Sequence, residues 1–184
     1  MPKGYFIVTH TKRKFYPLDP QPKDICILDI AHALSNICRF TGHCSKFYSV
    51  AQHSILVSEN VSIKDALWGL LHDASEAYIS DVSSPIKKQP EFKQYREIEK
   101  NIMIAIASAF CLPTEIPNNV KEKDLLLLRT EARDLGLITP EWDIYNMSPL
   151  KKTIAPLTPE AAKQRFLDRF DLFYYFVNPI ENRI

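Results

Sequence analysis

Three polar groups in one apolar stretch could do chemistry. The stretch 67–80, LWGLLHDASEAYIS, places the imidazole of His72 beside the carboxylate of Asp73, with Glu76 one helical turn later. The apolar residues around them recur at helical spacing and predict one amphipathic helix with these groups on one side. We expect Gly69, on the same side, to leave open space beside them. Because buried charged groups need a partner, this side predicts a bound ligand.

Two further residues complete a set of metal ligands. His53 is the polar residue of an apolar helix that starts at Ser49, and Asp124 lies near the start of a later helix. An aspartate at that place also interacts favourably with the helix dipole, so both interpretations of Asp124 stay open. Two imidazoles and two carboxylates suit Mn²⁺, Co²⁺, Ni²⁺, Fe²⁺ or Zn²⁺ better than Mg²⁺ or Ca²⁺. Such an ion lowers the pKa of a bound water and polarises a phosphoryl oxygen.

A cationic and aromatic segment precedes the first of these histidines. It runs RFTGHCSKFY over 39–48, and Gly42 interrupts the helix before it. Arginine binds phosphate through two hydrogen bonds and a ring can pack on a sugar or base, so the segment is an anion-recognition loop or a solvated loop. The loop 79–88 after the site helix carries Asp81 and Lys87. It faces a ligand or is a polar connector.

The elements that must position these groups are helices. The spacing of apolar residues predicts an all-α fold of about six helices in one domain. The chain divides into an N-terminal loop with a short strand or hairpin at 5–9, a core, and a last helix. These parts cover residues 1–24, 25–135 and 158–177 of 184. The predicted helices span 27–38, 49 to the turn at 60–62, 67–80, 91–110, 119–134 and 158–177.

Capping residues mark several of the predicted helix starts. Ser49 with Gln52 fits a capping box, and Ser62 with Asp65 fits another before the site helix. Asn119 is the expected cap of the helix that carries Asp124. The last helix is expected to begin at Thr158-Pro159, with its aromatic stripe either in the core or at an interface.

Four other residues have simpler expectations. We expect His10 at the surface, and His32 either in a structural role or beside a site. Trp142 and Tyr145, in the irregular stretch before the last helix, are expected to fold onto the core.

Composition excludes several function classes. The net charge is +1, which gives no argument for nucleic-acid or membrane binding. The four cysteines show no CxxC spacing, so we expect reduced thiols in a cytoplasmic protein. No apolar stretch approaches the roughly 20 residues of a membrane span. The first residues lack the apolar run of a signal peptide, and we expect none.

The ordered pattern H…HD…D on successive helices resembles the HD-domain metal-dependent phosphohydrolase superfamily. Residues 29–39, 47–54 (FYSVAQHS), 70–87 (LLHDASEAYISDVSSPIK) and 124–135 look like phage and prophage HD hydrolases. They are more distantly similar to bacterial 5′-deoxynucleotidases and to the phage dATP triphosphohydrolase linked to diaminopurine-containing genomes. The resemblance covers roughly residues 25–135 and implies a helical HD-domain bundle.

The resemblance also implies roles for single residues. The family's metal ligands match His53, His72, Asp73 and Asp124. The acidic residue that orients or deprotonates the attacking water matches Glu76. The linker between the first two metal histidines is shorter than in the deoxynucleotidases.

Substrate-binding roles follow from the same resemblance. Arg39 and Phe40 match an arginine–aromatic pair in which the arginine meets phosphate during catalysis and the ring discriminates against a ribose 2′-OH. Phe40 replaces the tryptophan usual in the deoxynucleotidases. Asp81 matches a residue that contacts the sugar 3′-OH, and Lys87 and His43 are further candidates for binding the substrate.

The implied activity is cleavage of the 5′ phosphate ester of free 2′-deoxynucleotides. The substrate would be a triphosphate, as for a dATPase, or a monophosphate, as for a 5′-nucleotidase. One divalent transition metal (Co, Mn, Zn, Ni or Fe) would occupy the site, with a second ion, Mg²⁺, on a triphosphate. We expect a homo-oligomer, dimer or hexamer, that needs neither polymeric nucleic acid nor a membrane. The alternatives are an HD phosphodiesterase acting on another nucleotide, and a non-catalytic module that binds nucleotides or a replication partner.

Overall fold

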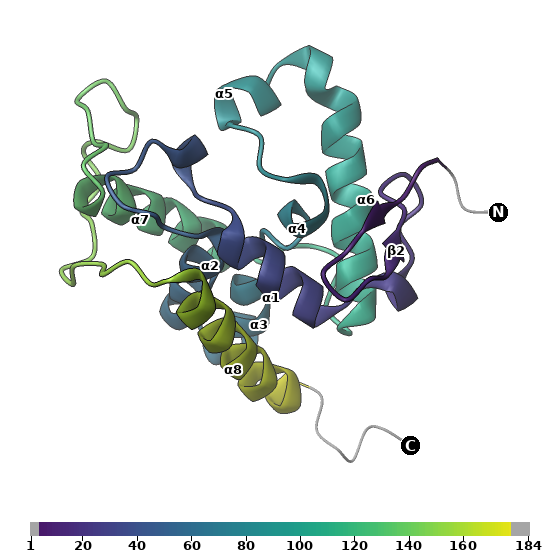
Figure 1. The fold of residues 1–184 in the computed structure, drawn as a ribbon. Coiled ribbons are helices and arrows are strands. Elements are labelled where there is room, and N and C mark those ends of the chain that lie inside the picture. The colour runs from purple at the N-terminus through teal and green to yellow at the C-terminus, as the bar shows by residue number, and fades with distance from the viewer. Residues whose placement is uncertain (1–3, 178–184) are drawn as a thin grey trace.

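Helices dominate the part of the chain that the computed structural model describes, residues 4–177 (Figure 1). This confirms the predicted helical class. Strand β1 (Ile7–Val8) lies within the predicted range 5–9, and it forms a hairpin with β2 (Lys14–Phe15), which lies beyond that range. None of the described helices has both the length and the apolar character to cross a membrane. The helices are α1 (Ile27–Asn36), α2 (Val50–Asn60), α3 (Ala66–Leu71), α4 (Glu76–Ile79), α5 (Ser84–Lys87), α6 (Lys93–Ala109), α7 (Asn118–Asp134) and α8 (Pro159–Val177).

The hydrophobic core forms where α1, α2, α3 and α8 pack together (Figure 1). Ile30 and Leu34 of α1 and Leu67 and Leu70 of α3 have no exposed surface. Their spacing of three or four residues is the helical repeat read from the sequence, so each helix turns one apolar stripe toward the others. The core therefore holds α2 and α3, which carry the histidines of interest, against a common support.

The aromatic stripe of α8 packs into this core. Phe166, Phe170 and Phe173 are buried, whereas Leu172 on the same helix is exposed. The helix begins as predicted, because Thr158 Oγ1 accepts a hydrogen bond from the backbone N–H of Ala161 at 3.3 Å. Of the two interpretations of the stripe, the structure supports core packing.

The cap of α2 connects this helix to a distant segment. Ser49 Oγ accepts a hydrogen bond from the backbone N–H of Gln52 at 3.1 Å, which confirms the predicted cap. The second half of the capping box is missing, because the Gln52 side chain bonds elsewhere. Its Nε2 donates to the carbonyl of Ala155 and its Oε1 accepts from the backbone N–H of Leu157, both at 2.8 Å. Gln52 thus fastens the chain ahead of α8 onto α2.

The predicted single helix over 67–80 is wrong. Helix α3 ends at Leu71, residues 72–75 form turns, and α4 begins at Glu76. The break occurs because hydrogen bonds here join residues three apart, as from the Glu76 N–H to the Asp73 carbonyl at 3.0 Å. The His72-Asp73 doublet therefore lies in a turn at the end of α3 and not on a helix face.

Gly69 does not leave open space. A Cβ at this position would lie 2.9 Å from Cα of Ser58, which belongs to α2. The absent side chain lets the α2 and α3 backbones approach closely. This close approach brings the neighbouring parts of both helices together, including His53 on α2 and His72 just after α3.

Two predicted caps differ from the structure. Helix α7 begins at Asn118 with Pro117 as its cap residue, two positions earlier than the expected cap at Asn119. The Asn119 amide instead donates to Asp65 at 3.2 Å. Ser62 also uses its hydroxyl to bond the Asp65 carboxylate, at 2.7 Å, and makes no cap hydrogen bond to the backbone.

Trp142 and Tyr145 do not fold onto the core as predicted, since 36% and 41% of their surfaces are exposed. Successive turns in this segment direct Ile144 inward in their place. The Trp142 ring stacks over Phe40 with centroids 6.5 Å apart. The segment therefore covers the loop before α2 with an aromatic side chain.

The N-terminal hairpin is fastened to α1. The backbone N–H and the hydroxyl of Thr11 donate to the Asp29 carboxylate at 2.7 and 2.9 Å. Phe15 of β2 is fully buried in the core. His10 is exposed, as predicted, and its ring stacks on that of His32 with centroids 3.7 Å apart, which favours the structural role for His32.

Candidate metal centre

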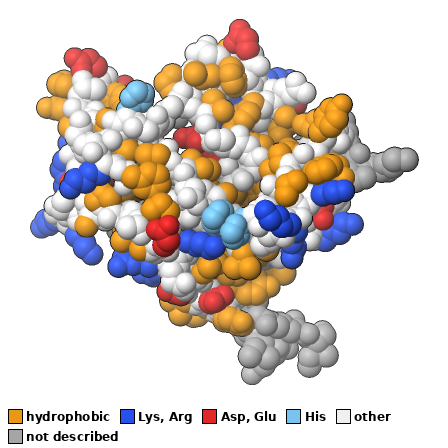
Figure 2. Space-filling view, in the orientation of Figure 1, with side chains coloured by type: hydrophobic (Ala, Val, Ile, Leu, Met, Phe, Trp, Pro, Cys, Tyr) orange, Lys and Arg blue, Asp and Glu red, His pale blue; other side chains and the backbone are white. Residues whose placement is uncertain are grey.

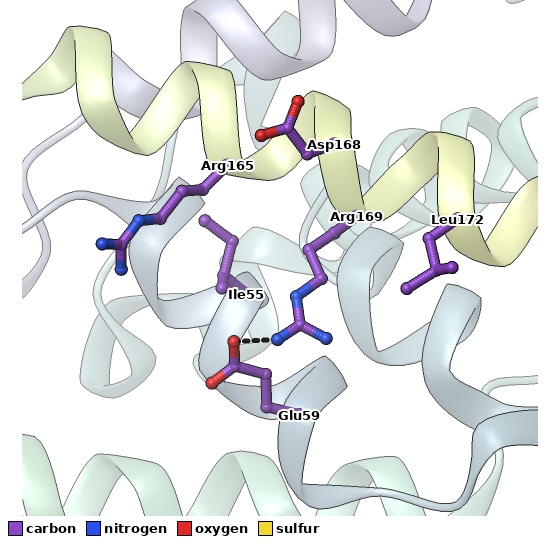
Figure 3. Close-up of a pocket in the computed structure, with 6 residues that line it drawn as sticks. All are labelled: Ile55, Glu59, Arg165, Asp168, Arg169 and Leu172. Atoms are coloured by element: carbon purple, nitrogen blue, oxygen red, sulfur yellow. Dashed lines mark hydrogen bonds and ion pairs between the residues drawn. The ribbon is translucent and has the colours of Figure 1, made fainter.

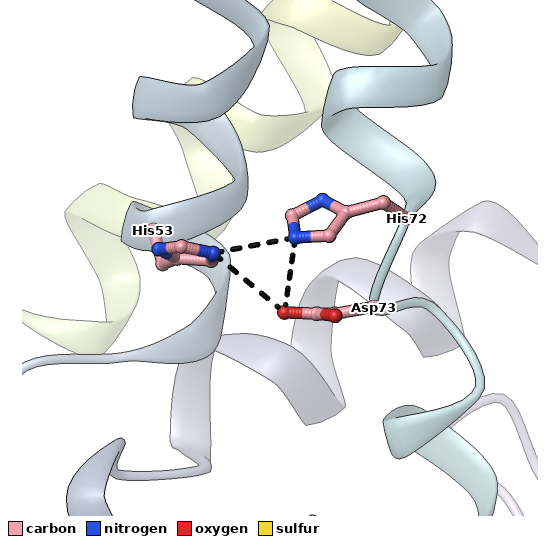
Figure 4. Close-up of side chains that lie close together, drawn as sticks. All are labelled: His53, His72 and Asp73. Atoms are coloured by element: carbon pink, nitrogen blue, oxygen red, sulfur yellow. Dashed lines mark hydrogen bonds and ion pairs between the residues drawn. The ribbon is translucent and has the colours of Figure 1, made fainter. Parts of the chain in front are cut away.

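Three side chains predicted as metal ligands meet at one point (Figure 4). His53 comes from α2, and His72 and Asp73 from the turn after α3. The Nε2 atoms of the two histidines are 3.2 Å apart, and Asp73 Oδ2 lies 3.2 Å from His72 Nε2 and 3.8 Å from His53 Nε2. Nineteen residues separate the histidines in sequence, so packing of α2 on α3 creates the cluster.

The fourth predicted ligand adjoins the same point. Asp124, on α7, places Oδ1 3.1 Å from His53 Nε2. Its carboxylate is 44% exposed, so it closes the cluster on the solvent side. The structure therefore brings the other three residues of the predicted set within 3.8 Å of His53 Nε2.

The hydrogen bonds of the two imidazoles determine which ring nitrogens are free. His72 Nδ1 is 2.8 Å from the carbonyl oxygen of Gly69, which can only accept, so Nδ1 carries the proton. His53 Nδ1 is 2.6 Å from the carboxylate of Glu131, which fixes the same tautomer. Both Nε2 lone pairs then point at one another across 3.2 Å. Two lone pairs at this distance need a proton or a cation between them.

The spacing of these atoms fits a divalent transition metal. With bonds of about 2.0–2.2 Å, neighbouring ligand atoms lie about 2.9 Å apart around an octahedral ion and about 3.3 Å apart around a tetrahedral one. The distances that His53 Nε2 makes to His72, Asp124 and Asp73 are 3.2, 3.1 and 3.8 Å. Neutral imidazole nitrogen and carboxylate oxygen are donors that such ions accept. The cluster can therefore hold a metal ion, with nitrogen and oxygen ligands from three parts of the chain.

Glu131, which the sequence analysis did not assign, supports the centre from behind. It is fully buried and bonds His53 Nδ1, while its Oε1 also accepts from the Tyr48 hydroxyl at 2.8 Å. Its Oε2 accepts from Arg39 Nε at 3.1 Å. Burial raises the pKa of Glu131, but Arg39 and His53 outweigh burial and lower it, so the carboxylate stays ionised. The signal for it was its place seven residues after Asp124 on the same helix face.

Arg39 lies at the edge of the centre. Its NH1 atom is 3.7 Å from Asp73 Oδ2, and its side chain is 14% exposed. Burial lowers the pKa of Arg39, but Glu131 and Asp73 raise it well above its usual range. A permanent cation therefore stands beside the doublet, held on one side by a buried carboxylate.

The electrostatics of the cluster favour a bound positive charge. Burial and Arg39 lower the pKa of His53, yet Glu131 and hydrogen bonds to Asp124 and Glu131 raise it to about 9. Burial raises the pKa of Asp73, but His72 and His53 lower it well below its usual range. A proton occupies this point without a metal, and a divalent ion would take its place.

Glu76 is the acidic residue of the site that lacks a partner. It is buried, and its Oε2 has no hydrogen-bond partner among the described residues. Burial and the charges of Asp73 and Asp81 raise its pKa well above the usual value. A buried carboxyl group with a free oxygen is suited to exchange a proton with a bound molecule.

The remaining candidates lie further out. The Phe40 ring is 5.5 Å from the Arg39 guanidinium carbon, and His43 is exposed in the same loop. Asp81 is exposed beyond α4. Lys87 Nζ bonds the Glu99 carboxylate at 2.7 Å, so this lysine is already paired.

A cavity of about 570 Å³ lies against the His72–Asp73 doublet. Its lining includes the basic residues Arg96 and Lys100 and the acidic residues Glu99 and Glu115, so its charge is mixed. Figure 2 shows acidic side chains at the floor of a hollow in the centre of one face, beside α5 in the orientation of Figure 1.

A second pocket of about 370 Å³ lies between α2 and α8 (Figure 3). Ile55 and Leu172 line it, together with the ion pair between Glu59 and Arg169. None of the four candidate metal ligands lines this pocket, so it is separate from the centre.

The fold and the cluster define a predominantly helical protein with a buried His–His–Asp site able to hold a metal ion. The chain belongs to the same family as the Escherichia coli protein YfdR, to which it is 41% identical over 169 residues, 90% of this chain and 94% of YfdR. A Rhodobacter capsulatus protein is 35% identical over 137 residues, 67% of this chain and 69% of that protein. Both relatives are named only as uncharacterized proteins. No protein-family model matches the chain.

Proposed function

We propose that this protein is a metal-dependent phosphohydrolase of the HD type that cleaves the 5′ phosphate ester of free 2′-deoxynucleotides. The observation that carries the proposal is the convergence of two Nε2 atoms with the Asp73 carboxylate, while both Nδ1 atoms are bonded elsewhere. The order of these residues along the chain, with Asp124 last, is that of the H…HD…D pattern. A structural ion pair alone would not need both Nε2 atoms to face each other while both Nδ1 atoms are bonded elsewhere.

The four residues around His53 Nε2 would hold one divalent transition ion. When bound, this ion would polarise a phosphoryl oxygen and lower the pKa of a water ligand. His53, His72, Asp73 and Asp124 would supply four protein ligands. An octahedral ion would then keep positions for water and for substrate.

Arg39 would bind the phosphate of the substrate. Its guanidinium lies beside Asp73, and Glu131 takes its Nε. NH1 is 3.7 Å from Asp73 Oδ2, beyond hydrogen-bond distance, so both terminal nitrogens could face phosphate oxygens, which is the arrangement arginine uses for this group. A fixed cation at this place stabilises the charge that develops on the equatorial oxygens during displacement.

Glu76 would accept the proton of the attacking water. Its raised pKa makes the ionised carboxylate a stronger base than that of an ordinary glutamate, which favours proton transfer from the water. The water oxygen forms a bond to Pα in line with the bond to the nucleoside 5′ oxygen, which breaks and leaves the nucleoside. A monophosphate would give phosphate and a triphosphate would give tripolyphosphate, by the same bond changes.

The outer residues would contribute to substrate selection. Phe40, with Trp142 stacked over it, offers an aromatic surface beside Arg39 for the sugar or base. Asp81 would contact the sugar 3′-OH. Lys87 would have to leave Glu99 before it could bind phosphate, so its role ranks below that of Arg39. His43 would act at the mouth of the site.

The test is a panel of free nucleotides with metal-depleted protein reloaded with Mn²⁺ or Co²⁺. Deoxynucleoside monophosphates and triphosphates, their ribose counterparts and cyclic dinucleotides are supplied separately, and released phosphate, tripolyphosphate and nucleoside are measured. We expect turnover of deoxynucleotides that chelation abolishes. Turnover of cyclic dinucleotides alone would show an HD phosphodiesterase. Metal binding with no turnover of any nucleotide would overturn the proposal in favour of a non-catalytic module.

A further inference from the structure

Two of the four cysteines lie against each other in the loop that carries Arg39. The sulfur atoms of Cys38 and Cys44 are 3.5 Å apart, in hydrogen-bond contact, and both side chains are partly exposed. The Cys44 thiol also lies 3.8 Å from the carbonyl oxygen of Arg39. All four cysteines are free thiols. The pairing of these two is therefore a feature of the loop, and the mechanism proposed above does not use it.

We propose that Cys38 and Cys44 form a reversible disulfide, which makes this loop a modification site for small disulfide oxidants of the glutathione class. A disulfide needs sulfur atoms at about 2.05 Å, so the two must approach by roughly 1.5 Å. Side-chain rotation and a small loop movement suffice for a displacement of this size. The thiols are accessible to a small oxidant because neither is buried.

More backbone hydrogen bonds to other segments hold the loop at Cys38 than at Cys44. Cys38 forms a β-bridge with Ser49, and the flanking backbone hydrogen bonds, Arg39 N–H to Tyr48 and Val50 N–H to Ile37, measure 2.9 and 3.0 Å. Next to Cys44, one backbone hydrogen bond, from the Ser45 N–H to the Leu135 carbonyl at 3.2 Å, holds the loop to the residue after α7. Closure of the disulfide should therefore displace the Cys44 segment more readily than the Cys38 end, which stays in register.

The backbone between the cysteines already has the shape of a tight ring. Phe40, Thr41 and Gly42 have φ angles of 54°, 52° and 79°, three consecutive residues in the left-handed region. Residues other than glycine rarely adopt a positive φ, and this backbone conformation persists only where the surrounding structure stabilises it. The bend brings the two ends of the loop together, and this proximity favours disulfide closure over reaction with a second oxidant molecule.

The reaction is balanced by two exchange steps. The thiolate of one cysteine attacks glutathione disulfide, forms a mixed disulfide and releases one glutathione thiolate. The thiolate of the other cysteine then attacks the protein sulfur, forms the Cys38–Cys44 bond and releases the second glutathione. Burial and the hydrogen bond to Cys38 raise the pKa of Cys44, so less of this thiol is ionised than of an ordinary cysteine, and we expect it to act second. Two protons leave the protein, and two electrons pass to the oxidant.

Closure changes the surroundings of Arg39. It removes the Cys44 S–H that points at the Arg39 carbonyl and holds the segment that carries both Arg39 and Phe40 in a ring. This consequence rests on the proposed function: if Arg39 and Phe40 bind the substrate, oxidation should raise KM severalfold with little change in metal affinity. The formation of the disulfide does not depend on that function.

The test uses the full chain at pH 8, incubated with excess glutathione disulfide. We expect thiol titration of the denatured product to show loss of two of the four thiols. Mass spectrometry of its peptides should show Cys38 joined to Cys44 with the loss of two hydrogen atoms, and dithiothreitol should restore both thiols. Four intact thiols, or stable glutathione adducts on either cysteine, would overturn the proposal.

Two variants make the test specific. In Cys26→Ser/Cys111→Ser, only the proposed pair remains, and both of its thiols should still be lost. In Cys38→Ser, the residual thiol at Cys44 should gain at most a glutathione adduct and no cross-link. Loss of both thiols with a link to Cys26 or Cys111 in the unmodified protein would also count against the proposal. Because neither metal nor nucleotide is added, these results do not depend on whether the protein is a phosphohydrolase.

Discussion

Nδ1 of His53 lies 2.6 Å from Oε1 of Glu131, and the same carboxylate takes Arg39 Nε through its other oxygen at 3.1 Å. One buried group thus orients both a candidate metal ligand and a candidate phosphate ligand. Carboxylates behind metal-bound histidines raise the basicity of the ring and fix its tautomer. Substitution of Glu131 is therefore expected to weaken both metal binding and phosphate binding.

Glu131→Gln should weaken metal binding about 10- to 100-fold. The amide keeps the size of the side chain but removes the charge that supports the His53 imidazole. Isothermal titration with Co²⁺ or Mn²⁺ measures the change, and thermal melts report whether the variant folds. The matched control is Tyr48→Phe, which removes another hydrogen bond to Glu131 at 2.8 Å without touching His53. Equal losses in the two variants would contradict a specific role for the carboxylate.

Asp73→Ala should remove bound metal and nucleotide hydrolysis together. Its carboxylate is the oxygen ligand nearest to His72 Nε2, at 3.2 Å. Metal content is measured by elemental analysis after desalting, alongside turnover. Asp81→Asn is the control, because this exposed carboxylate should not hold the ion. A variant at position 73 that keeps its metal would place the ion elsewhere.

Glu76→Gln should keep the metal and lose rate. Removal of a general base typically lowers kcat about 10²- to 10⁴-fold. The amide also fills the same buried space, so the free energy of unfolding should change little. Stopped assays of nucleoside release give kcat, and titration gives metal affinity. Unchanged turnover would remove Glu76 from its proposed role.

The stabilisation that a metal gives should increase with pH. The pKa of His53 is raised to about 9 from its usual 6.5, so its proton stabilises the metal-free fold below about pH 6.5. That stabilisation is lost as pH rises through about 9. Because an ion on Nε2 excludes this proton, the loaded protein should not show this loss. The difference in Tm with and without Co²⁺ should therefore grow from pH 6.5 to 9, and a constant or shrinking difference would contradict the assignment.

Gly69→Ala should destabilise the protein by about 1–3 kcal/mol. The added Cβ would lie 2.9 Å from Cα of Ser58, and backbone at that distance cannot yield easily. Urea unfolding measures the loss. Gly136→Ala is an informative control, since it has open space but a φ of 77° and so tests backbone strain alone. If Gly69→Ala leaves the free energy of unfolding unchanged, α2 and α3 are further apart at this position than the structure describes.

The helices were predictable because each carries an apolar stripe at a local spacing. The long helix predicted over 91–110 corresponds to a short 3-10 turn followed by α6, and the Ser49 cap appears as expected. The break after Leu71 was not predictable, since apolar residues continue at helical spacing across the turn. Only the hydrogen bonds between residues three apart reveal it.

The ligands could be predicted by type and order, but their supports could not. Histidine and aspartate in a recurring order point to a metal wherever the helices lie. The spacing of seven residues places Glu131 on the same helix face as Asp124, but its bonds to His53 and Arg39, across 78 and 92 residues, do not follow from that spacing. Trp142 and Tyr145 were placed wrongly because aromatic character alone does not tell which side of an irregular segment faces inward.

The side chain of Gln52 couples the segment ahead of α8 to the position of His53. Its amide holds the backbone at Ala155 and Leu157, and the next residue in α2 is His53. Ending the chain before residue 155 would remove these hydrogen bonds from α2, the helix that carries the His53 imidazole. A truncation that keeps every candidate ligand would therefore still weaken metal binding, so the segment from residue 155 onward is part of the functional unit.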